Sequence, residues 1–186
     1  PAYLTIDAHA TSDLQHEVGG FLVGRPYAWD GQLYVEIVDA LPGEQTQSGA
    51  AHLTIMPETW AQAQQTARSK FPGLYLVGWY HTHPRMSVFM SAQDVAIHEG
   101  FFQEPWHVSL VIEPVSREAG FFVWEQGVIR AANSYQIDYP STSPERERWQ
   151  KPRSRRIDLD ALPPTLDEFY EPGFYRTRWD EPDELA

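Results

Sequence analysis

The sequence predicts an α/β domain that occupies most of the chain and is followed by an extended C-terminal segment. Short stretches rich in β-branched and aromatic residues alternate with helical patterns as far as about residue 138. The 186 residues are 42% hydrophobic and 13% aromatic, which is enough for one substantial core. Beyond residue 138 these patterns stop. We therefore predict a domain at residues 1–138 and an extension at residues 139–186.

Five stretches are predicted to be strands because they are short, apolar or aromatic, and bounded by Gly, Pro or Asp. Between the first two, Asp30-Gly31 is a turn signal that is typical of a β-hairpin. The five predicted strands cover residues 21–24, 33–39, 74–80, 107–113 and 120–129.

Two helices are predicted between these strands. The first covers residues 57–71, because Pro57 suits a first helical turn and Pro72-Gly73 ends the pattern. Its apolar stripe comprises Trp60, Ala63, Ala67 and Phe71. The second helix is expected to begin at Ser91. The residues that precede Glu17 are polar and few, so no well-marked helix is predicted there.

The C-terminal extension has an unusual composition. Residues 140–186 contain seven of the fifteen prolines. Residues 141–156 are basic, with six Lys or Arg against two Glu, whereas residues 157–186 are acidic, with nine Asp or Glu against two Arg. Such a segment seldom forms its own core. Because it also carries several aromatic residues, we expect a tail that lays some of them on the domain or on a partner.

Charge and cysteine content exclude several classes of function. The formal net charge is -12 at pH 7, which argues against a nucleic-acid partner, since nucleic-acid binders present a basic surface. There are no cysteines, so disulfides and thiolate metal sites are excluded. The lack of cysteine is compatible with a reducing cytoplasm, where we expect the protein to be. No apolar run is long enough for a membrane span, so no membrane association is predicted.

The stretch GWYHTHP, residues 78–84, predicts a metal site. Residues i and i+2 of a strand face the same side, so His81 and His83 project together where Pro84 ends the strand. Asp94 lies in the first turn of the following helix and can supply a third ligand. Two imidazoles and one carboxylate are ligands of a catalytic zinc ion and leave a position for water. Such a zinc ion lowers the pKa of its water to about 7.

Each part of this pattern also has a purely structural interpretation. A His-x-His pair occurs by chance on strands, and Ser91 with Asp94 resembles an ordinary helix-capping arrangement. The complete spacing, His-x-His, seven residues, Ser, two residues, Asp, is more specific than its parts. Glu17, just before Gly19-Gly20, offers a carboxylate that could take a proton from water, although a solvated loop residue is the alternative.

With these residues together, the chain resembles the JAMM, or MPN-plus, metalloprotease family. The resemblance covers about residues 3–135 and rests on the motifs HEVGGFLVG, GWYHTHP and SAQD. It implies a single MPN domain in which helices flank a mixed β-sheet. It also implies cleavage of an amide, typically the isopeptide bond between the C-terminus of ubiquitin or a ubiquitin-like protein and a lysine.

The resemblance assigns a role to each of five residues. His81, His83 and Asp94 would bind one catalytic Zn²⁺ ion. Glu17 would be the general base that carries a proton from water to the leaving amine. Ser91 would donate a hydrogen bond to the oxyanion of the tetrahedral intermediate. These roles agree with the interpretation of the residues themselves.

A substrate groove is also implied, bordered by the residues between the metal ligands. Phe89 and Met90 would line it and contact substrate, although core packing is an equal alternative for both. About six residues separate the second helix from the next strand, which leaves no room for the long insertion of linkage-selective members. The chain is therefore similar to compact members that accompany prokaryotic ubiquitin-like conjugation systems, whose proteins are further expected partners.

Two other functions stay open at this point. Many MPN domains have lost ligands and serve as non-catalytic scaffold subunits, and a zinc hydrolase of this fold could act on a small molecule or a sulfur-carrier adduct.

Among neighbouring residues, Trp79 is predicted to be core, and Tyr80 core or a support of the site. His98 is interpreted as a surface residue, with support of the site as the alternative. The histidines interpreted as structural or solvent-facing are His9, His16, His52 and His107.

Overall fold

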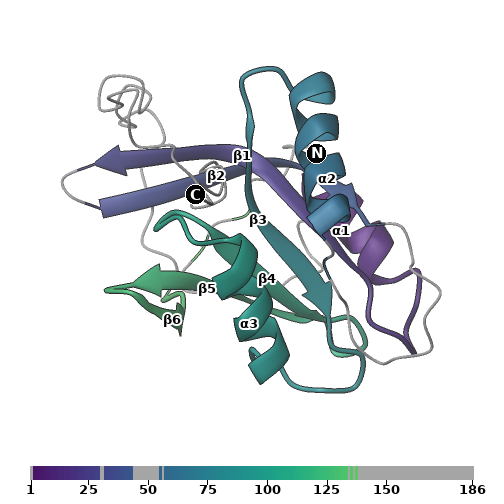
Figure 1. Cartoon of the computed structure of the whole chain (residues 1–186). Helices are drawn as coiled ribbons and strands as arrows, with labels where there is room; N and C mark the ends of the chain where they lie inside the picture. The colour runs from purple at the N-terminus through teal and green to yellow at the C-terminus, as the bar shows by residue number, and fades with distance from the viewer. Residues whose placement is uncertain are drawn as a thin grey trace, which may run out of the picture.

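The computed structural model describes residues 2–29, 32–43, 55, 57–133, 135 and 137. Three helices and six strands form one layered domain (Figure 1). The predicted extension and His52 lie outside the described residues. In chain order the elements are α1 (Ala2–Ala10), β1 (Gly19–Trp29), β2 (Gln32–Pro42), α2 (Pro57–Lys70), β3 (Tyr75–Thr82), α3 (Ala92–Phe101), β4 (Val108–Glu113), β5 (Glu118–Glu125) and β6 (Val128–Ala131).

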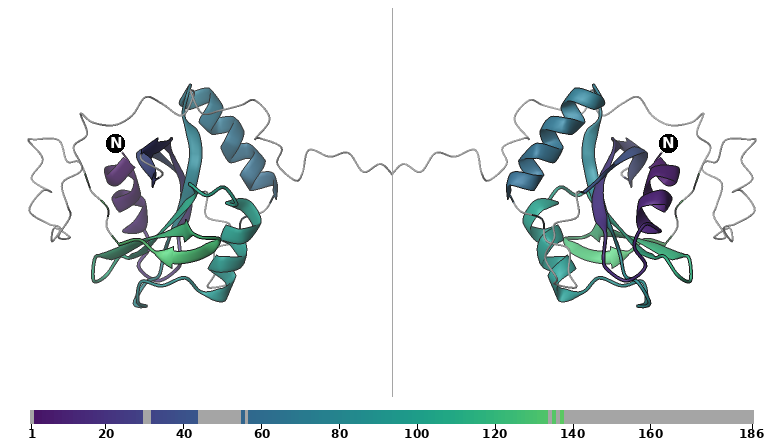
Figure 2. Two further views of the ribbon diagram at one scale, coloured as in Figure 1. Left: turned by 90° about the vertical axis from the view of Figure 1, so that its left-hand side faces the viewer. Right: turned by 90° about the vertical axis from the view of Figure 1, so that its right-hand side faces the viewer.

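The six strands form one mixed sheet in the order β2-β1-β3-β4-β5-β6. Only β3 and β4 are parallel, and α3 connects them, as a parallel pair requires. The helix α1 covers one face of the sheet, whereas α2 and α3 cover the other (Figure 2). These findings confirm the predicted α/β class and mixed sheet. Within the described ranges, no helix has the length and apolar character that crossing a membrane requires.

The predicted strands and helices are found with modest changes. The first two strands form the predicted antiparallel hairpin, although Asp30 and Gly31 themselves lie outside the described residues. The stretch 120–129, predicted as one strand, is divided between β5 and β6. A tight turn at Gln126-Gly127 separates them, and both residues have positive φ, at 52° and 76°. Glycine adopts this conformation without a steric penalty, which explains its place in the turn.

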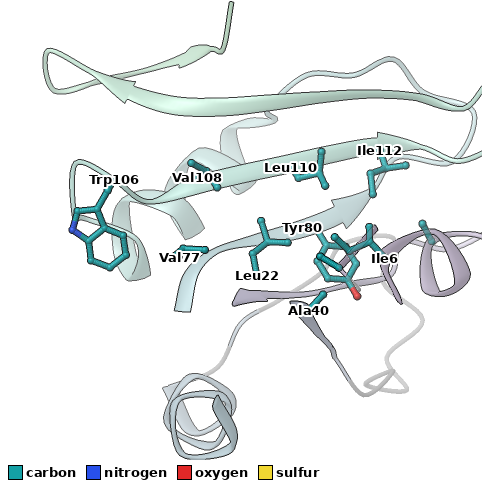
Figure 3. Close-up of a cluster of buried hydrophobic side chains, with 11 residues drawn as sticks. Ile6, Leu22, Ala40, Val77, Tyr80, Trp106, Val108, Leu110 and Ile112 are labelled. Atoms are coloured by element: carbon teal, nitrogen blue, oxygen red, sulfur yellow. The ribbon is translucent and has the colours of Figure 1, made fainter. Parts of the chain in front are cut away.

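Two apolar clusters lie on opposite faces of the sheet. On the α1 face, Leu22 and Tyr80 pack with Ile6 of α1 (Figure 3). On the α2 and α3 face, Trp79 packs with Phe102. Because neighbouring residues of a strand face opposite sides, Tyr80 and Trp79 each anchor a different cluster. Both residues are fully buried, which confirms that Trp79 is core and, of the two alternatives for Tyr80, favours core.

The helix α1 was not predicted from the sequence. Its buried residues Ala2, Ile6 and Ala10 recur every four positions, but two of the three are alanine, so the apolar pattern is weak. At its C-terminal end, His9 Nδ1 lies 2.8 Å from the hydroxyl of Tyr80. This contact confirms a structural role for His9. It also ties α1 to the strand that carries the predicted metal ligands.

Candidate metal centre

The two histidines lie at the end of β3, and the residue between them fixes their position. Thr82 donates its backbone N–H to Val18 O at 2.8 Å, and its Oγ1 accepts the Val18 N–H at 2.9 Å. His83 N–H donates to Ile112 O of β4, also at 2.8 Å. The intervening threonine therefore joins the strand end to the chain that enters β1. No signal in the sequence pointed to this role of Thr82.

The third predicted ligand is held by the start of α3. Ser91 is the N-cap, and its Oγ accepts the Asp94 N–H at 3.1 Å. In return, Asp94 Oδ2 accepts the Ser91 N–H at 2.7 Å. This capping box fixes the carboxylate in the first helical turn, where only 5% of Asp94 is exposed. The capping interpretation is thus correct, and it also aims Asp94 at the histidines.

The three side chains converge. Asp94 Oδ1 lies 3.4 Å from His81 Nε2, and Asp94 Oδ2 lies 3.4 Å from His83 Nε2. One ligand atom from each residue falls within 4.8 Å of the others, and this is the group found among the described residues that could hold a metal ion. Bonds of about 2.0–2.1 Å to a tetrahedral zinc ion place ligand atoms about 3.3 Å apart. The two Asp94–histidine distances are close to this value, and the group as a whole is small enough that it could hold a metal ion.

The surroundings of His81 provide a further test of this fit. His81 is fully buried, and neither ring nitrogen has a hydrogen-bond partner in the described part of the chain. An unsatisfied buried polar group costs about 1–3 kcal/mol. A cation bound at Nε2 would remove much of that cost. His81, His83 and Asp94 thus form a candidate metal site on donor chemistry and on burial.

Electrostatics keeps the aspartate ionised. Burial of Asp94 acts to raise its pKa, but the imidazoles of His81 and His83 outweigh this effect and hold the pKa far below its usual range. Burial of His83 acts to lower its pKa, but the adjacent Asp94 carboxylate outweighs it, so the pKa is raised. A permanently ionised carboxylate beside two imidazoles attracts a cation.

Glu17 lies beside these residues but outside the three-residue ligand group. Its Oε1 is 3.9 Å from His83 Nε2, and its side chain is 8% exposed. The adjacent Val18 is bonded to Thr82, and Gly19 pairs with His81 across β1 and β3. The structure therefore brings Glu17 to the predicted metal ligands. The alternative of a solvated loop residue is wrong.

Two contacts support the two histidines of the candidate site. The Trp79 ring stacks on His81 with centroids 4.4 Å apart, and Trp79 Nε1 donates to His98 Nδ1 at 3.0 Å. His83 Nδ1 lies 3.4 Å from the carbonyl oxygen of Ser87, a contact that leaves Nε2 directed at Asp94. His98 is fully buried, so its interpretation as a surface residue is wrong. Its burial could not be read from the sequence, because α3 has little helical amphipathicity.

The two predicted substrate-contacting residues differ in their surroundings. Phe89 is 41% exposed, and its ring lies 4.8 Å from that of His83. Met90 is half-buried and packs against the core cluster on the α2 and α3 face. Phe89 thus borders the candidate metal centre, whereas Met90 follows the packing alternative.

Acidification from pH 6.5 to pH 4.5 is expected to lower the free energy of unfolding. Burial lowers the pKa of His98 to about 4 and, with a contribution from His98, that of His107 to about 3. The unfolded chain therefore binds more protons, so the stability present above pH 6.5 is lost as the pH falls. Each histidine contributes at most about 1.4 kcal/mol per pH unit.

Denaturant unfolding in the presence of a chelator measures this loss without a contribution from metal release. The lowered carboxyl pKa values of Asp94 and Glu113 add to the loss near the acid end of this interval, where the unfolded carboxyl groups begin to bind protons, so the slope above about pH 5.5 is the part that reports on the histidines. A free energy of unfolding that is constant from pH 6.5 to pH 4.5 would contradict the buried, neutral state of the two histidines.

Comparison with known proteins points to one family. Residues 2–104 match the model described as JAB1/Mov34/MPN/PAD-1 ubiquitin protease. COP9 signalosome complex subunit 5 of Drosophila melanogaster is 30% identical over 116 residues, which cover 61% of this chain and 35% of that protein. NAD(+) hydrolase TcpA of a Theionarchaea archaeon is 30% identical over 105 residues, or 56% of this chain and 29% of that protein. The chain thus spans about a third of the length of these relatives.

A further relative is similar to this chain over a comparable length. The 26S proteasome regulatory subunit rpn11 of Schizosaccharomyces pombe is 26% identical over 124 residues, which cover 64% of this chain and 38% of that protein. Among solved structures, a protein of Desulfitobacterium hafniense gives a TM-score of 0.47 at 22% identity, with 70% of this chain and 84% of that chain covered.

Proposed function

The chain belongs to the JAB1/Mov34/MPN/PAD-1 ubiquitin protease family, and on that premise we propose that it is a zinc-dependent isopeptidase or peptidase. It cleaves the bond that follows the C-terminus of ubiquitin or of a ubiquitin-like protein. The observation that carries the proposal is the convergence of His81, His83 and Asp94, with Glu17 beside them. We further propose that it acts in the cytoplasm, together with proteins of a conjugation pathway.

The donor set favours zinc as the ion. Two imidazole nitrogens and one carboxylate oxygen form a typical three-residue set of catalytic zinc sites. When bound by His81, His83 and Asp94, zinc would act as a Lewis acid and would lower the pKa of a water molecule. Because the chain has no cysteine, a second site built on thiolates is excluded. One catalytic ion is therefore expected.

Glu17 would transfer the proton of the reaction, and Ser91 would stabilise the negative charge of the oxyanion. The Glu17 carboxylate accepts a proton from the attacking water and transfers it to the leaving amine. Ser91 Oγ accepts the Asp94 N–H, so its own hydroxyl hydrogen remains available to an oxyanion. Such a donor stabilises the transition state when it already points to the place where charge develops.

The surface beside the candidate centre suits an extended peptide. Phe89 lies against His83 and is exposed, so it offers an apolar contact next to the reacting bond. An extended C-terminal tail could pair with adjacent backbone as an added strand. These features favour the tail of a ubiquitin-like protein over a compact substrate.

Two measurements on the full chain test the proposal. Elemental analysis is expected to find about one zinc ion per chain. Incubation with ubiquitin-like proteins that carry a C-terminal reporter is expected to release the reporter, and a chelator is expected to stop the release. A protein that binds no metal and cleaves nothing would be a scaffold. One that holds zinc but cleaves none of the fusions would instead be a hydrolase of small molecules or sulfur-carrier adducts.

A further inference from the structure

Glu113 is a buried carboxylate that neither the proposed reaction nor the core uses. It is the last residue of β4 and is 4% exposed. In the described part of the chain it has no Lys, Arg or His partner, because none of the ion pairs found there includes it. A buried carboxylate without a cation must be stabilised by hydrogen bonds. Its partners therefore indicate its role.

The partners of Glu113 are backbone N–H groups from two separate segments. Oε1 accepts from Arg85 at 2.8 Å and from Val115 at 3.1 Å, and Oε2 accepts from Ser116. Burial acts to raise the pKa of Glu113, but the hydrogen bonds, chiefly those of Ser116, outweigh it and lower the pKa to about 2. The carboxylate thus stays ionised and joins the chain after His83 to the turn between β4 and β5.

The segment joined in this way, residues 84–90, is called the 84–90 loop. Arg85 has a φ of 61°, a left-handed conformation that non-glycine residues rarely adopt. Arg85 is also the residue whose backbone N–H donates to Glu113. Strain of this kind persists only where the surroundings fix it. The carboxylate of Glu113 is the partner that fixes Arg85.

The 84–90 loop is also attached at Ser87 and Val88. Ser87 O lies 3.4 Å from His83 Nδ1. Val88 fits closely over Gly120 of β5, where an added Cβ would lie 2.8 Å from Val88 Cγ1. On either side of these attachments, Met86 and Phe89 are 43% and 41% exposed. The loop is therefore fixed at its backbone while it presents two apolar side chains beside the candidate centre.

We propose that Glu113 is a positioning residue: it holds the 84–90 loop against the β4–β5 turn and so sets the surface that Met86 and Phe89 present to a substrate. Glu113 touches no metal ligand side chain and acts only through the backbone of the loop. Its removal should therefore loosen this loop while the rest of the sheet remains intact. The effect on substrate rests on the proposed function, whereas the effect on the loop does not.

Limited trypsin digestion of the full chain tests the loop directly. The bond after Arg85 is exposed but held in a conformation that a protease cannot use. In Glu113→Gln, an NH₂ group replaces one of the two carboxylate oxygens. That group cannot accept a hydrogen bond from a backbone N–H, so part of the attachment is lost. Cleavage after Arg85 is expected to become about tenfold faster relative to cleavage after Arg130 in β6. The matched control is Glu118→Gln, which removes the same charge from an exposed residue that pairs with Glu113 in register.

Hydrogen exchange in the unmodified protein gives a second test that needs no variant. The amides of Arg85, Val115 and Ser116 are expected to exchange slowly although all three residues are exposed. In the active enzyme, Glu113→Gln is expected to raise KM for a ubiquitin-like substrate more than it lowers kcat. Rapid exchange at the three amides would overturn the proposal, as would equal acceleration of cleavage after Arg85 and Arg130. If slow exchange and selective cleavage are found without any hydrolysis, the positioning role stands and the proposed function fails.

Discussion

Replacement of Glu17 by Gln is expected to reduce kcat/KM for a ubiquitin-like fusion by about 10²- to 10⁴-fold while the protein keeps its zinc. Glutamine has the size of glutamate but cannot accept the proton. The side chain is buried and its Oε1 lies 3.9 Å from His83 Nε2, so no other group easily takes its place. Reporter release and zinc content, measured on the same preparation, check both parts of the expectation.

A matched control separates the base from a general effect of charge. Glu99→Gln removes one negative charge from the exposed side of α3 and is expected to leave hydrolysis unchanged. If Glu17→Gln retained full activity, the assignment of the base would be wrong. If it instead lost zinc in proportion to activity, Glu17 would be a metal ligand.

The elements that position the site could be predicted because their signals are local. The strand before His81 and His83 is apolar and ends at a proline, and Ser91 with Asp94 is a recognisable helix start. The side chains of His81 and His83 share a face because strand periodicity requires it. Convergence of Asp94 on that face required the additional assumption that α3 returns over the strand end.

The parts that could not be predicted depend on contacts between distant segments. The helix α1 has a stripe of small residues, and its stability comes from packing on the sheet and from the contact of His9 with Tyr80. His98 is buried against Trp79, nineteen residues away, whose Nε1 donates to it. Glu113 resembles an ordinary charged strand end until Arg85 and the β4–β5 turn are brought beside it.

The capping and catalytic interpretations of Ser91 and Asp94 prove to be compatible. One oxygen of Asp94 accepts the Ser91 N–H, while the other faces His81. A helix start is therefore also the means by which a carboxylate is fixed against two imidazoles. Because Asp94 serves both the capping box and the candidate site, the short spacing from Ser91 to Asp94 predicts more than a helix cap.

Asp94→Asn is expected to weaken zinc binding by at least about 100-fold and to abolish hydrolysis. Changes to residues that merely support a metal ligand weaken binding by about 10- to 100-fold, so loss of a ligand itself should cost more. The amide oxygen of asparagine can still accept the Ser91 N–H, so α3 should persist. Chelator competition measures zinc affinity, and thermal unfolding of the metal-free protein measures the helix.

Ser91→Ala is the comparison that decides between the two roles of Asp94. This substitution removes the Ser91 hydroxyl, which accepts the Asp94 N–H in the capping box, and should lower the free energy of unfolding by about 1 kcal/mol. It leaves His81, His83 and Asp94 in place. Zinc affinity should therefore fall far more in Asp94→Asn than in Ser91→Ala, whereas stability of the metal-free protein should fall more in Ser91→Ala. Equal loss of zinc in both variants would mean that Asp94 acts by capping α3, and the three-ligand site would have to be abandoned.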